Sequence, residues 1–308
     1  MPLTQRQKMV TSRKNPSASI APWFPRVPRQ QLLKGSIYKF KIWRGVFLIF
    51  ALLSFNACAE TTNTTTPEGA KQFLKLRGYQ FDDKSFLTAA VRGDVMAVNA
   101  FLAAGINPDV KDETRGETVL IAAATRGDLV IAKTLVDGGA DVNAKSPTGA
   151  NALIRALENK HEEISALLLA KPNLDLNTQR GDGTTALMIY AAREKEPEVT
   201  QLLERGANVN LQDVEGDTAL HRASQSGSLK IVQLLLDKSA NPNIQNKVGG
   251  TPLMWAGAFG YHEIAELLLA RGANPRLRDE DGVTASAWAT KNNQSDLANV
   301  LREAERKQ

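Results

Sequence analysis

The chain has 308 residues, of which 43% are hydrophobic and 6% aromatic, with one cysteine and three histidines. This composition is typical of a globular chain and argues against collagen-like, low-complexity and multi-span membrane proteins. A single cysteine excludes an intramolecular disulfide framework, and with so few histidines a structural zinc site is disfavoured.

The formal net charge of +5 is unevenly distributed along the chain. Residues 1–59 contain ten Lys or Arg and no Asp or Glu, which leaves 28 basic and 33 acidic side chains in residues 60–308. The pI near 9.2 therefore reflects the N-terminal segment alone. Because the remainder is mildly acidic, we expect no nucleic acid among the partners.

The N-terminal segment has the order of an export signal. Its basic residues end at Arg44, and the apolar run 46–55 follows. Ten helical residues would span about 15 Å, half of a bilayer core, so this run is too short to cross a membrane. A basic region, a short apolar region and small residues at a cut site predict a secretory signal.

Two cleavage sites compete at the end of this segment. Residues 57–59 read Ala-Cys-Ala, an A-x-A site that would release a chain beginning at Glu60. Alternatively, residues 55–58 resemble a bacterial lipobox, with Cys58 as the lipidated first residue and membrane anchor. The alanine before Cys58 fits that pattern, whereas the phenylalanine and asparagine before it depart from it. Both alternatives predict an exported protein, either periplasmic or a membrane-anchored lipoprotein.

About 33 residues precede the basic region, which is longer than an ordinary signal. A start codon assigned too far upstream would explain the excess. An organelle transit peptide, similarly acid-poor, and a cytoplasmic tail that stays attached are the alternatives. The Thr-rich stretch 60–67 follows and is expected to be a flexible linker. Residues 68–80, with Phe73, Leu74 and Leu76, predict a short helix that caps the next domain.

A period of 33 residues governs the rest of the chain, and such a period indicates a repeat architecture. A Gly-x-Thr pair or a near match recurs at steps of 33 or 34. The pairs are Gly116/Thr118, Gly149/Asn151, Gly183/Thr185, Gly216/Thr218, Gly249/Thr251 and Gly282/Thr284. A second series, Gly-Ala-Asp/Asn-x-Asn, begins at Gly139 and Gly206, and two short helical patterns lie between the two series.

These residues resemble the ankyrin repeat, with its T-P-L-H, G-x-x-x-x-V-x-x-L-L and G-A-D-V-N signatures. The resemblance covers about residues 82–306 in seven units and defines a predicted repeat domain over 81–308. It implies an all-α solenoid of helix-turn-helix units joined by β-hairpin-like loops. A tetratricopeptide array has a similar period but lacks the Gly-Ala-Asp/Asn-x-Asn turn.

Local chemistry agrees with stacked units. Threonines at 118, 185, 218, 251 and 284 can cap the first helix of their units, and the glycines at 139, 206 and 272 can end the second helix in a left-handed conformation. Once-per-unit leucines predict one continuous core, and once-per-unit small residues predict close stacking. These are Leu120, Leu153, Leu187, Leu220 and Leu253, and Ala123/Ala124, Ala156, Ala191, Ala223, Ala256 and Ala289.

Two departures from the period are expected to distort the solenoid locally. The third unit reads Ala-Lys-Pro-Asn-Leu-Asp over residues 170–175, with one extra residue and no glycine, so its turn must differ. The first hairpin also holds one extra residue, around 113–115.

The resemblance implies that partners bind the hairpin tips and the concave face of the first helices. Register places eight candidate partner-binding residues on that face: Arg92, Arg126, Arg155, Arg193, Arg222, Trp255, Phe259 and Trp288. Arginine and tryptophan are frequent binding hot spots, although arginines can also be solvated and tryptophans can pack between repeats. The face is thus expected to be basic in its N-terminal half and aromatic in its C-terminal half. The hairpin tips are mixed in charge and are expected to be ordinary solvated turns.

No catalytic constellation is visible. His221 ends a T-x-L-H tetrad, where the resemblance implies a structural hydrogen-bonding role, and no histidine pair has metal-ligand spacing. We therefore expect neither enzyme activity nor a cofactor or metal. The sequence predicts a monomeric, non-catalytic scaffold of the cell envelope that binds a partner protein. An envelope protein that binds a glycan or small ligand through the aromatic residues, and a cytosolic or organellar adaptor that keeps its basic tail, are the alternatives.

Overall fold

The computed structural model describes residues 66–307, which form fifteen α-helices and no strand beyond one isolated antiparallel bridge between Lys111 and Thr118. The helices are α2 (Pro67–Leu76), α3 (Asp83–Val91), α4 (Val95–Ala103), α5 (Val119–Arg126), α6 (Leu129–Asp137), α7 (Ala152–Glu158), α8 (Glu162–Leu169), α9 (Ala186–Ala192), α10 (Glu196–Glu204), α11 (Ala219–Ser226), α12 (Leu229–Asp237), α13 (Pro252–Phe259), α14 (His262–Ala270), α15 (Ala285–Lys291) and α16 (Ser295–Lys307).

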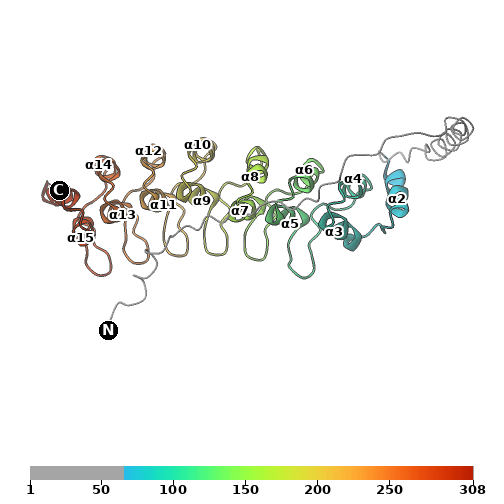
Figure 1. Ribbon diagram of the computed structural model, residues 1–308, viewed down its shortest axis with the longest axis horizontal. Coiled ribbons are helices and arrows are strands. Elements are labelled where there is room, and N and C mark those ends of the chain that lie inside the picture. The colour runs from blue at the N-terminus through green and yellow to red at the C-terminus, as the bar shows by residue number, and fades with distance from the viewer. Residues whose placement is uncertain (1–65, 308) are drawn as a thin grey trace, which may run out of the picture. The chain divides into compact units, whose positions relative to one another are not determined.

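The helices after α2 form two rows (Figure 1). An inner row runs from α3 through α5, α7, α9, α11 and α13 to α15, and long hairpin loops project from its free side. An outer row, α4 to α16 with even numbers, covers the opposite side, and each inner helix packs on its own outer helix. The predicted all-α solenoid of seven helix-turn-helix units is confirmed.

The predicted caps begin the inner helices. Each of the five threonines accepts a hydrogen bond from the backbone N–H three residues later, at 3.3–3.4 Å, and each is buried. Asn151 does the same in the third unit, with its amide oxygen 3.0 Å from the Ile154 nitrogen. Because a buried, unpaired N–H at a helix start is costly, these side chains fix where each inner helix begins.

One continuous core lies between the rows. The five recurring leucines are all 0–1% exposed and belong to a single apolar cluster that runs the length of the array. The glycines at 139, 206 and 272 have φ between +87° and +88°, as the sequence predicts. In the fifth unit Ser239 takes this place with φ +64°, a conformation that costs a non-glycine residue about 1 kcal/mol.

The third and fourth units are joined loosely, at the place where the sequence predicts a local distortion because the third unit has one extra residue and no glycine. Here α7 packs less closely on α9 than the other inner helices do from α5 onward. The turn after α8 contains no residue with positive φ. Instead, the Arg205 guanidinium donates to the carbonyl oxygens of Leu169 at 2.5 Å, Lys171 at 2.8 Å and Pro172 at 3.3 Å. An arginine from the next repeat therefore satisfies carbonyls at this glycine-free turn.

Tyr190 also distinguishes this junction. It stands five residues after its cap, where the other units with a Thr or Asn cap have alanine, so the row of small residues is interrupted at Tyr190 although Ala191 beside it is buried. The tyrosine is 1% exposed, and its hydroxyl has no hydrogen-bond partner among the described residues. Ser165 lies near the Tyr190 hydroxyl, and its own hydroxyl donates to the His161 carbonyl at 3.0 Å. Burial raises the pKa of Tyr190 well above its usual value.

Successive hairpins are joined by single backbone hydrogen bonds. The donor and acceptor pairs are Gly181 to Thr148 (2.6 Å), Val214 to Asp182 (2.7 Å), Lys247 to Glu215 (2.8 Å) and Glu280 to Val248 (3.0 Å). The equivalent donor position in the second hairpin is Pro147, which has no N–H. The first hairpin, which carries the extra residue, is therefore not joined to the second in this way, and α3 packs less closely on α5.

Helix α2 precedes the first unit and packs on α4 through Ala70 and Leu74. Leu76, which the sequence suggested as part of this contact, is 74% exposed and lies outside it. The signal-like segment, its two cleavage sites and Cys58 lie outside the described residues. Within residues 66–307 no helix has the length and apolar character needed to cross a membrane.

Candidate partner-binding surface

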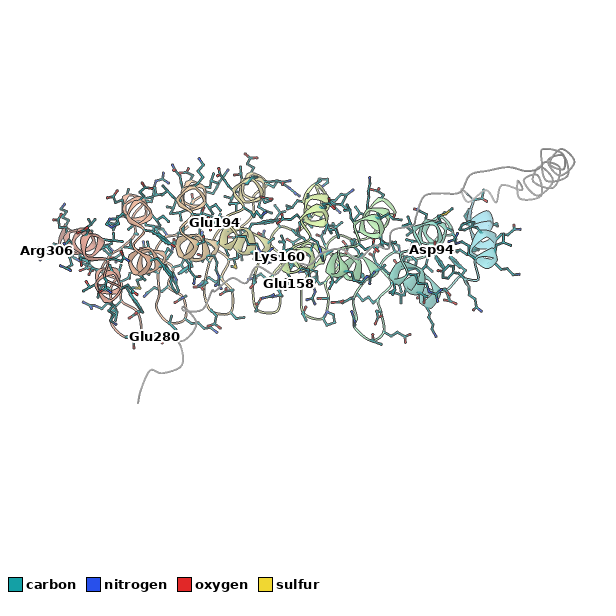
Figure 2. The ribbon with its side chains drawn as sticks, viewed as in Figure 1. Asp94, Glu158, Lys160, Glu194, Glu280 and Arg306 are labelled. Atoms are coloured by element: carbon teal, nitrogen blue, oxygen red, sulfur yellow. The ribbon has the colours of Figure 1, made fainter. Side chains whose placement is uncertain are left out.

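The inner helices and hairpins position the candidate residues, and the side chains of these residues fall into two groups. Some side chains are fixed by hairpin carboxylates, and others remain exposed. The hairpins lie along one side of the inner row, with Glu280 on the last of them (Figure 2). Arg155, Arg222 and Trp288, each four positions after its helix cap, are of the first kind.

Arg155 is held in a network of charges. Its guanidinium contacts Glu117 and Glu158, both at 3.1 Å, and donates to Thr148 at 3.0 Å. Glu158 in turn pairs with Arg180 of the third hairpin. Arg155 therefore connects the ends of several hairpins and adds no uncompensated positive charge to the surface.

Arg180 also pairs with Asp182 on its own hairpin. Its guanidinium lowers the pKa of the Asp182 carboxyl far below the usual value, and the two carboxylates raise the pKa of Arg180. This hairpin is therefore braced by charge pairs. The expectation of ordinary solvated turns is wrong here.

Arg222 is fixed in the same manner one repeat further on. It contacts Asp213 at 2.6 Å and Asp217 at 3.4 Å. The Asp213 side chain is 4% exposed, so this hairpin acid is buried, contrary to the same expectation. Asn246 of the next hairpin donates to Asp217 at 2.8 Å. Two of the five candidate arginines, 155 and 222, thus stabilise the scaffold.

The remaining arginines form no ion pair within residues 66–307. Arg92 and Arg126 are exposed at the ends of α3 and α5, and Arg193 is half-buried after α9. Arg126 makes only a long hydrogen bond, 3.4 Å, to the Ala90 carbonyl. Of the arginines predicted to make the N-terminal half of the face basic, only Arg92 and Arg126 are both exposed and without an ion pair in residues 66–307.

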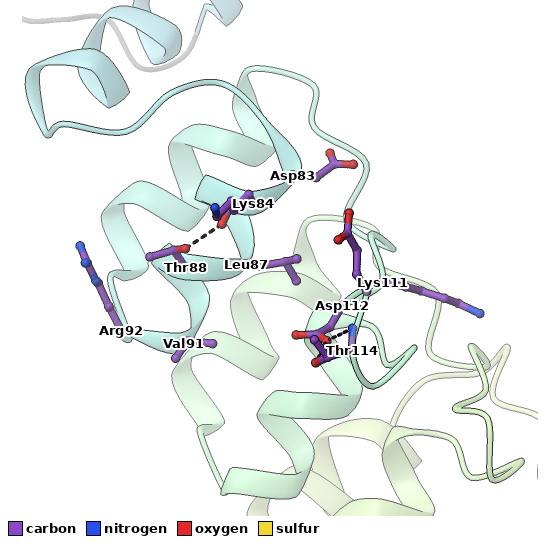
Figure 3. A pocket seen from close by; sticks show the side chains of 10 residues that line it. Asp83, Lys84, Leu87, Thr88, Val91, Arg92, Lys111, Asp112 and Thr114 are labelled. Atoms are coloured by element: carbon purple, nitrogen blue, oxygen red, sulfur yellow. Dashed lines mark hydrogen bonds between the residues drawn. The ribbon is translucent and has the colours of Figure 1, made fainter.

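A hollow of about 500 Å³ lies beside Arg92, between α3 and the first hairpin (Figure 3). Its apolar wall includes Leu87 and Val91, and Val91 is 67% exposed. Asp112 on the hairpin side is occupied by its own turn, because it accepts from the backbone N–H of Thr114 at 2.7 Å. The extra residue in this hairpin is the sequence signal that could have indicated the hollow.

The aromatic residues predicted for the C-terminal half of the face make two different kinds of contact. The Trp288 Nε1–H donates to Asp279 at 2.8 Å, the Lys291 ammonium lies 5.2 Å from its ring centre, and the ring packs on the core. Trp255 instead stacks on Phe259, with ring centres 6.0 Å apart and planes at 15°. Phe259 stacks on Tyr261 at 5.8 Å and 23°.

Tyr261 was not among the sequence candidates. It immediately precedes α14, and its ring lies against the turn of the preceding repeat at Gly227, where an added Cβ would be 2.7 Å from Cζ. A glycine in one repeat followed by an aromatic residue 34 positions later was the available signal.

His221 makes the structural contacts that the sequence suggested. Its Nδ1 accepts from the Thr218 backbone N–H at 3.1 Å, and Nε2–H donates to the Gly250 carbonyl at 3.2 Å. Burial lowers the pKa of His221 below 6.5. Within residues 66–307 no cluster of three His, Cys, Asp or Glu side chains has the arrangement of a metal site.

Comparison with known proteins identifies the repeat. The family model described as ankyrin repeats (3 copies) matches residues 86–180, 169–246 and 238–307. A solved ankyrin repeat domain from Acinetobacter baumannii AYE is 35% identical, with 62% of this chain and 99% of that chain covered and a TM-score of 0.56. The ankyrin repeat domain of Bcl-3, described as a unique member of the IkappaB protein family, is 30% identical, with 71% and 97% covered and a TM-score of 0.57. No curated protein matches the chain in a sequence search.

The chain belongs to the ankyrin-repeat family. Ankyrin repeats generally serve as protein–protein interaction modules and are typically non-catalytic. Membership of the family does not identify the partner, because the same scaffold carries different binding surfaces in different proteins.

Proposed function

We propose that this protein is a non-catalytic scaffold that binds a partner protein through the exposed side chains of its inner helices. One observation carries the proposal. Arg155, Arg222 and Trp288, each four positions after its helix cap, are bonded to neighbouring carboxylates, whereas Arg92, Arg126 and Phe259, at or just after the C-terminal ends of their inner helices, are exposed and form no ion pair.

Exposed arginine and aromatic side chains on a rigid support favour binding, because they supply hot-spot contacts with little ordering cost. A stacked solenoid provides such a support, since each repeat is held by its neighbours. The proposed contact surface therefore has two parts, a basic N-terminal part around the first hairpin and an aromatic C-terminal part on α13.

Site-specific photo-crosslinking in the native cell tests this proposal. A photoreactive amino acid at Arg92, Arg126 or Phe259 is expected to give a discrete higher-mass adduct. The matched controls are Lys133 and Lys230, which are also exposed but lie on the outer helices α6 and α12. Adducts of equal yield from both faces, or from the outer face alone, would refute the assignment of the binding surface.

We further propose that the scaffold is exported and held at an envelope membrane by a lipid on Cys58. The support is the order of basic, apolar and small residues before this cysteine, which is the only one in the chain. A lipid there would anchor the protein without a spanning helix.

Intact mass of the protein from separated membrane and soluble fractions tests the location. A chain beginning at Cys58 with acyl groups, in the membrane fraction, is the expected result. A chain beginning at Glu60 would indicate a soluble exported binder. A chain retaining residues 1–59 would contradict export and favour an adaptor with a basic tail.

A further inference from the structure

The hollow between α3 and the first hairpin lies where the first unit has a small side chain. Thr88 stands five residues before Gly93, the residue with positive φ that follows α3. In the third and fifth units Arg155 and Arg222 stand at the same distance before such a residue, and they reach hairpin carboxylates. The Thr88 hydroxyl instead donates to the Lys84 carbonyl of its own helix at 2.7 Å. Within residues 66–307 no hydrogen bond or ion pair joins an α3 side chain to the first hairpin, and the hollow lies between them (Figure 3).

The hollow has an apolar wall that faces solvent. Leu87 and Val91 lie one turn apart on α3, and Val91 is 67% exposed. A single exposed aliphatic side chain is ordinary, but this one lines a concavity of about 500 Å³, within the range of about 300–1,000 Å³ that is typical of ligand sites. A large apolar side chain placed there would remove both residues from water, which favours binding.

The charged side chains around the hollow have a positive excess. Seven of them are exposed and form no ion pair within residues 66–307: the cations Lys84, Arg92, Lys111, Arg115 and Arg126, and the acids Asp83 and Glu113. A third acid, Asp112, is occupied by its own turn, because it accepts from the backbone N–H groups of Thr114 and Arg115 at 2.7 and 2.9 Å. With all three acids counted the local net charge is +2, whereas residues 60–308 together carry −5.

Two further acids lie in the turns beside Arg92, and both are engaged. Asp94 and Asp128 cap α4 and α6, each accepting a backbone N–H at 3.1 Å. Asp94 also pairs with Arg77 at 3.0 Å. When these two acids and Arg77 are included, the local net charge is +1, so the excess keeps its sign.

The two arginines are close to the same end of α3. Arg92 follows the last residue of this helix, and the Arg126 guanidinium donates to the Ala90 carbonyl at 3.4 Å. Asp83 is the first residue of α3, nine residues before Arg92, which corresponds to a rise of about 13 Å. A carboxylate beside Val91 is therefore near two guanidinium groups and far from Asp83. Guanidinium groups bind carboxylates through paired, charge-assisted hydrogen bonds.

We propose that this hollow binds an acidic segment of the partner protein that carries one large apolar side chain. The apolar side chain lies against Leu87 and Val91, and a neighbouring carboxylate binds Arg92 and Arg126. This inference rests on the proposed function and names the chemistry of its partner. Charge complementarity selects this occupant, because a basic segment would be repelled by the cation excess and an uncharged one would gain nothing from the arginines.

Selection from a random heptapeptide library displayed on phage, with the full chain immobilised, tests the inference without choosing a sequence in advance. Enriched peptides are expected to contain a Leu, Ile, Met or Phe flanked by at least two Asp or Glu. The consensus peptide, labelled with fluorescein, is then titrated with the full chain and its variants. Raising the salt concentration from about 0.1 M to about 1 M is expected to weaken binding, because the charges are exposed.

Two variants and two matched controls locate the peptide. Arg92→Ser removes a guanidinium group and is expected to weaken binding about tenfold. Val91→Ser removes part of the apolar wall and is expected to weaken binding about fivefold. Lys133→Ser and Val130→Ser make the same kinds of change at exposed positions of the outer helix α6 and are expected to leave binding unchanged. All four side chains are exposed, so circular dichroism of each variant is expected to match wild type.

Several results would overturn the inference. Enrichment of basic or uncharged peptides would contradict the charge argument, and so would the absence of any enrichment. An equal loss for Arg92→Ser and Lys133→Ser would indicate attraction by overall charge instead of a site. Unchanged binding to Val91→Ser would place the peptide outside the hollow.

Crosslinking from Arg92 and Arg126 separates this inference from the general proposal. If those adducts form in the native cell while acidic peptides are not enriched, the inference about the hollow alone fails. If no inner-face position gives an adduct, the proposed function fails as well.

Discussion

The Tyr190 hydroxyl allows the stability of the loosely packed junction between the third and fourth units to be tested by removing a single oxygen atom. The Tyr190→Phe variant removes a hydroxyl that is buried and has no hydrogen-bond partner in residues 66–307, and it leaves the ring in place. A buried hydroxyl without a partner costs about 1–3 kcal/mol relative to its hydrated state. We therefore expect Tyr190→Phe to increase the free energy of unfolding by about 1 kcal/mol.

Urea unfolding monitored by far-UV circular dichroism measures this change. For an array of this length, 1 kcal/mol corresponds to a rise in melting temperature of about 2–4 °C. Tyr79→Phe is the matched control, because the Tyr79 hydroxyl donates to Asp94 at 3.3 Å. Its loss is expected to lower stability by about 1 kcal/mol, the opposite sign.

A Tyr190→Phe variant less stable than wild type would refute this reasoning. It would mean that the hydroxyl has a partner in solution, such as an ordered water bridging to Ser165. A variant of unchanged stability would show that the unfolded chain solvates this hydroxyl no better than the fold does, which also contradicts the argument.

Three further predictions concern the scaffold. His221→Gln is expected to lower stability by about 1–2 kcal/mol near pH 8 but less near pH 5. Since burial holds the folded-state pKa below 6.5, the contribution of the neutral ring is complete above pH 6.5 and is lost as pH falls through the folded pKa. Urea titrations at both pH values measure this, and a difference between wild type and variant that is independent of pH would contradict it. Gly227→Ala is expected to cost at least about 1 kcal/mol more than Gly206→Ala. Both positions have positive φ, but only at Gly227 would the new Cβ meet the Tyr261 ring, at 2.7 Å, so equal melting temperatures would argue against that contact. Truncation to residues 1–245 is expected to expose the apolar face of α12 and to cause aggregation or loss of cooperative unfolding, and a soluble fragment that unfolds cooperatively would disprove the continuous core.

The regular part of the fold was predictable because its signals are local and repeated. Threonine caps, glycine turns and once-per-unit leucines each act within one repeat, and the structure confirms all three. The altered turn of the third unit was also predictable, since the missing glycine removes the residue best suited to positive φ. Tyr190 was missed because Ala191 beside it satisfied the same pattern, and only the count from the cap distinguishes the two.

The candidate surface was less predictable, because it depends on contacts between repeats. Register correctly placed arginines on the inner row, but it could not show that Glu117, 38 positions earlier, neutralises Arg155. The pair of Asp213 and Arg222 lies within one repeat, nine positions apart, so this ion pair could have been predicted from the sequence. Tyr261 escaped because its ring comes from an outer-helix start, a position not counted as part of the concave face.

The absence of an N–H at Pro147 bears on where residues can be inserted into this protein. A hairpin that is bonded to neighbours on both sides cannot grow without displacing two other loops. The first hairpin is not bonded to the second, because Pro147 stands at the donor position and has no N–H. The first hairpin also already holds one residue more than its counterparts. The entropic cost of closing a loop rises only slowly with its length. We therefore expect inserted residues to be tolerated best in the first hairpin, which is not bonded to the second. The first hairpin is thus the natural place to graft a foreign peptide or a reporter while the six following repeats keep their register.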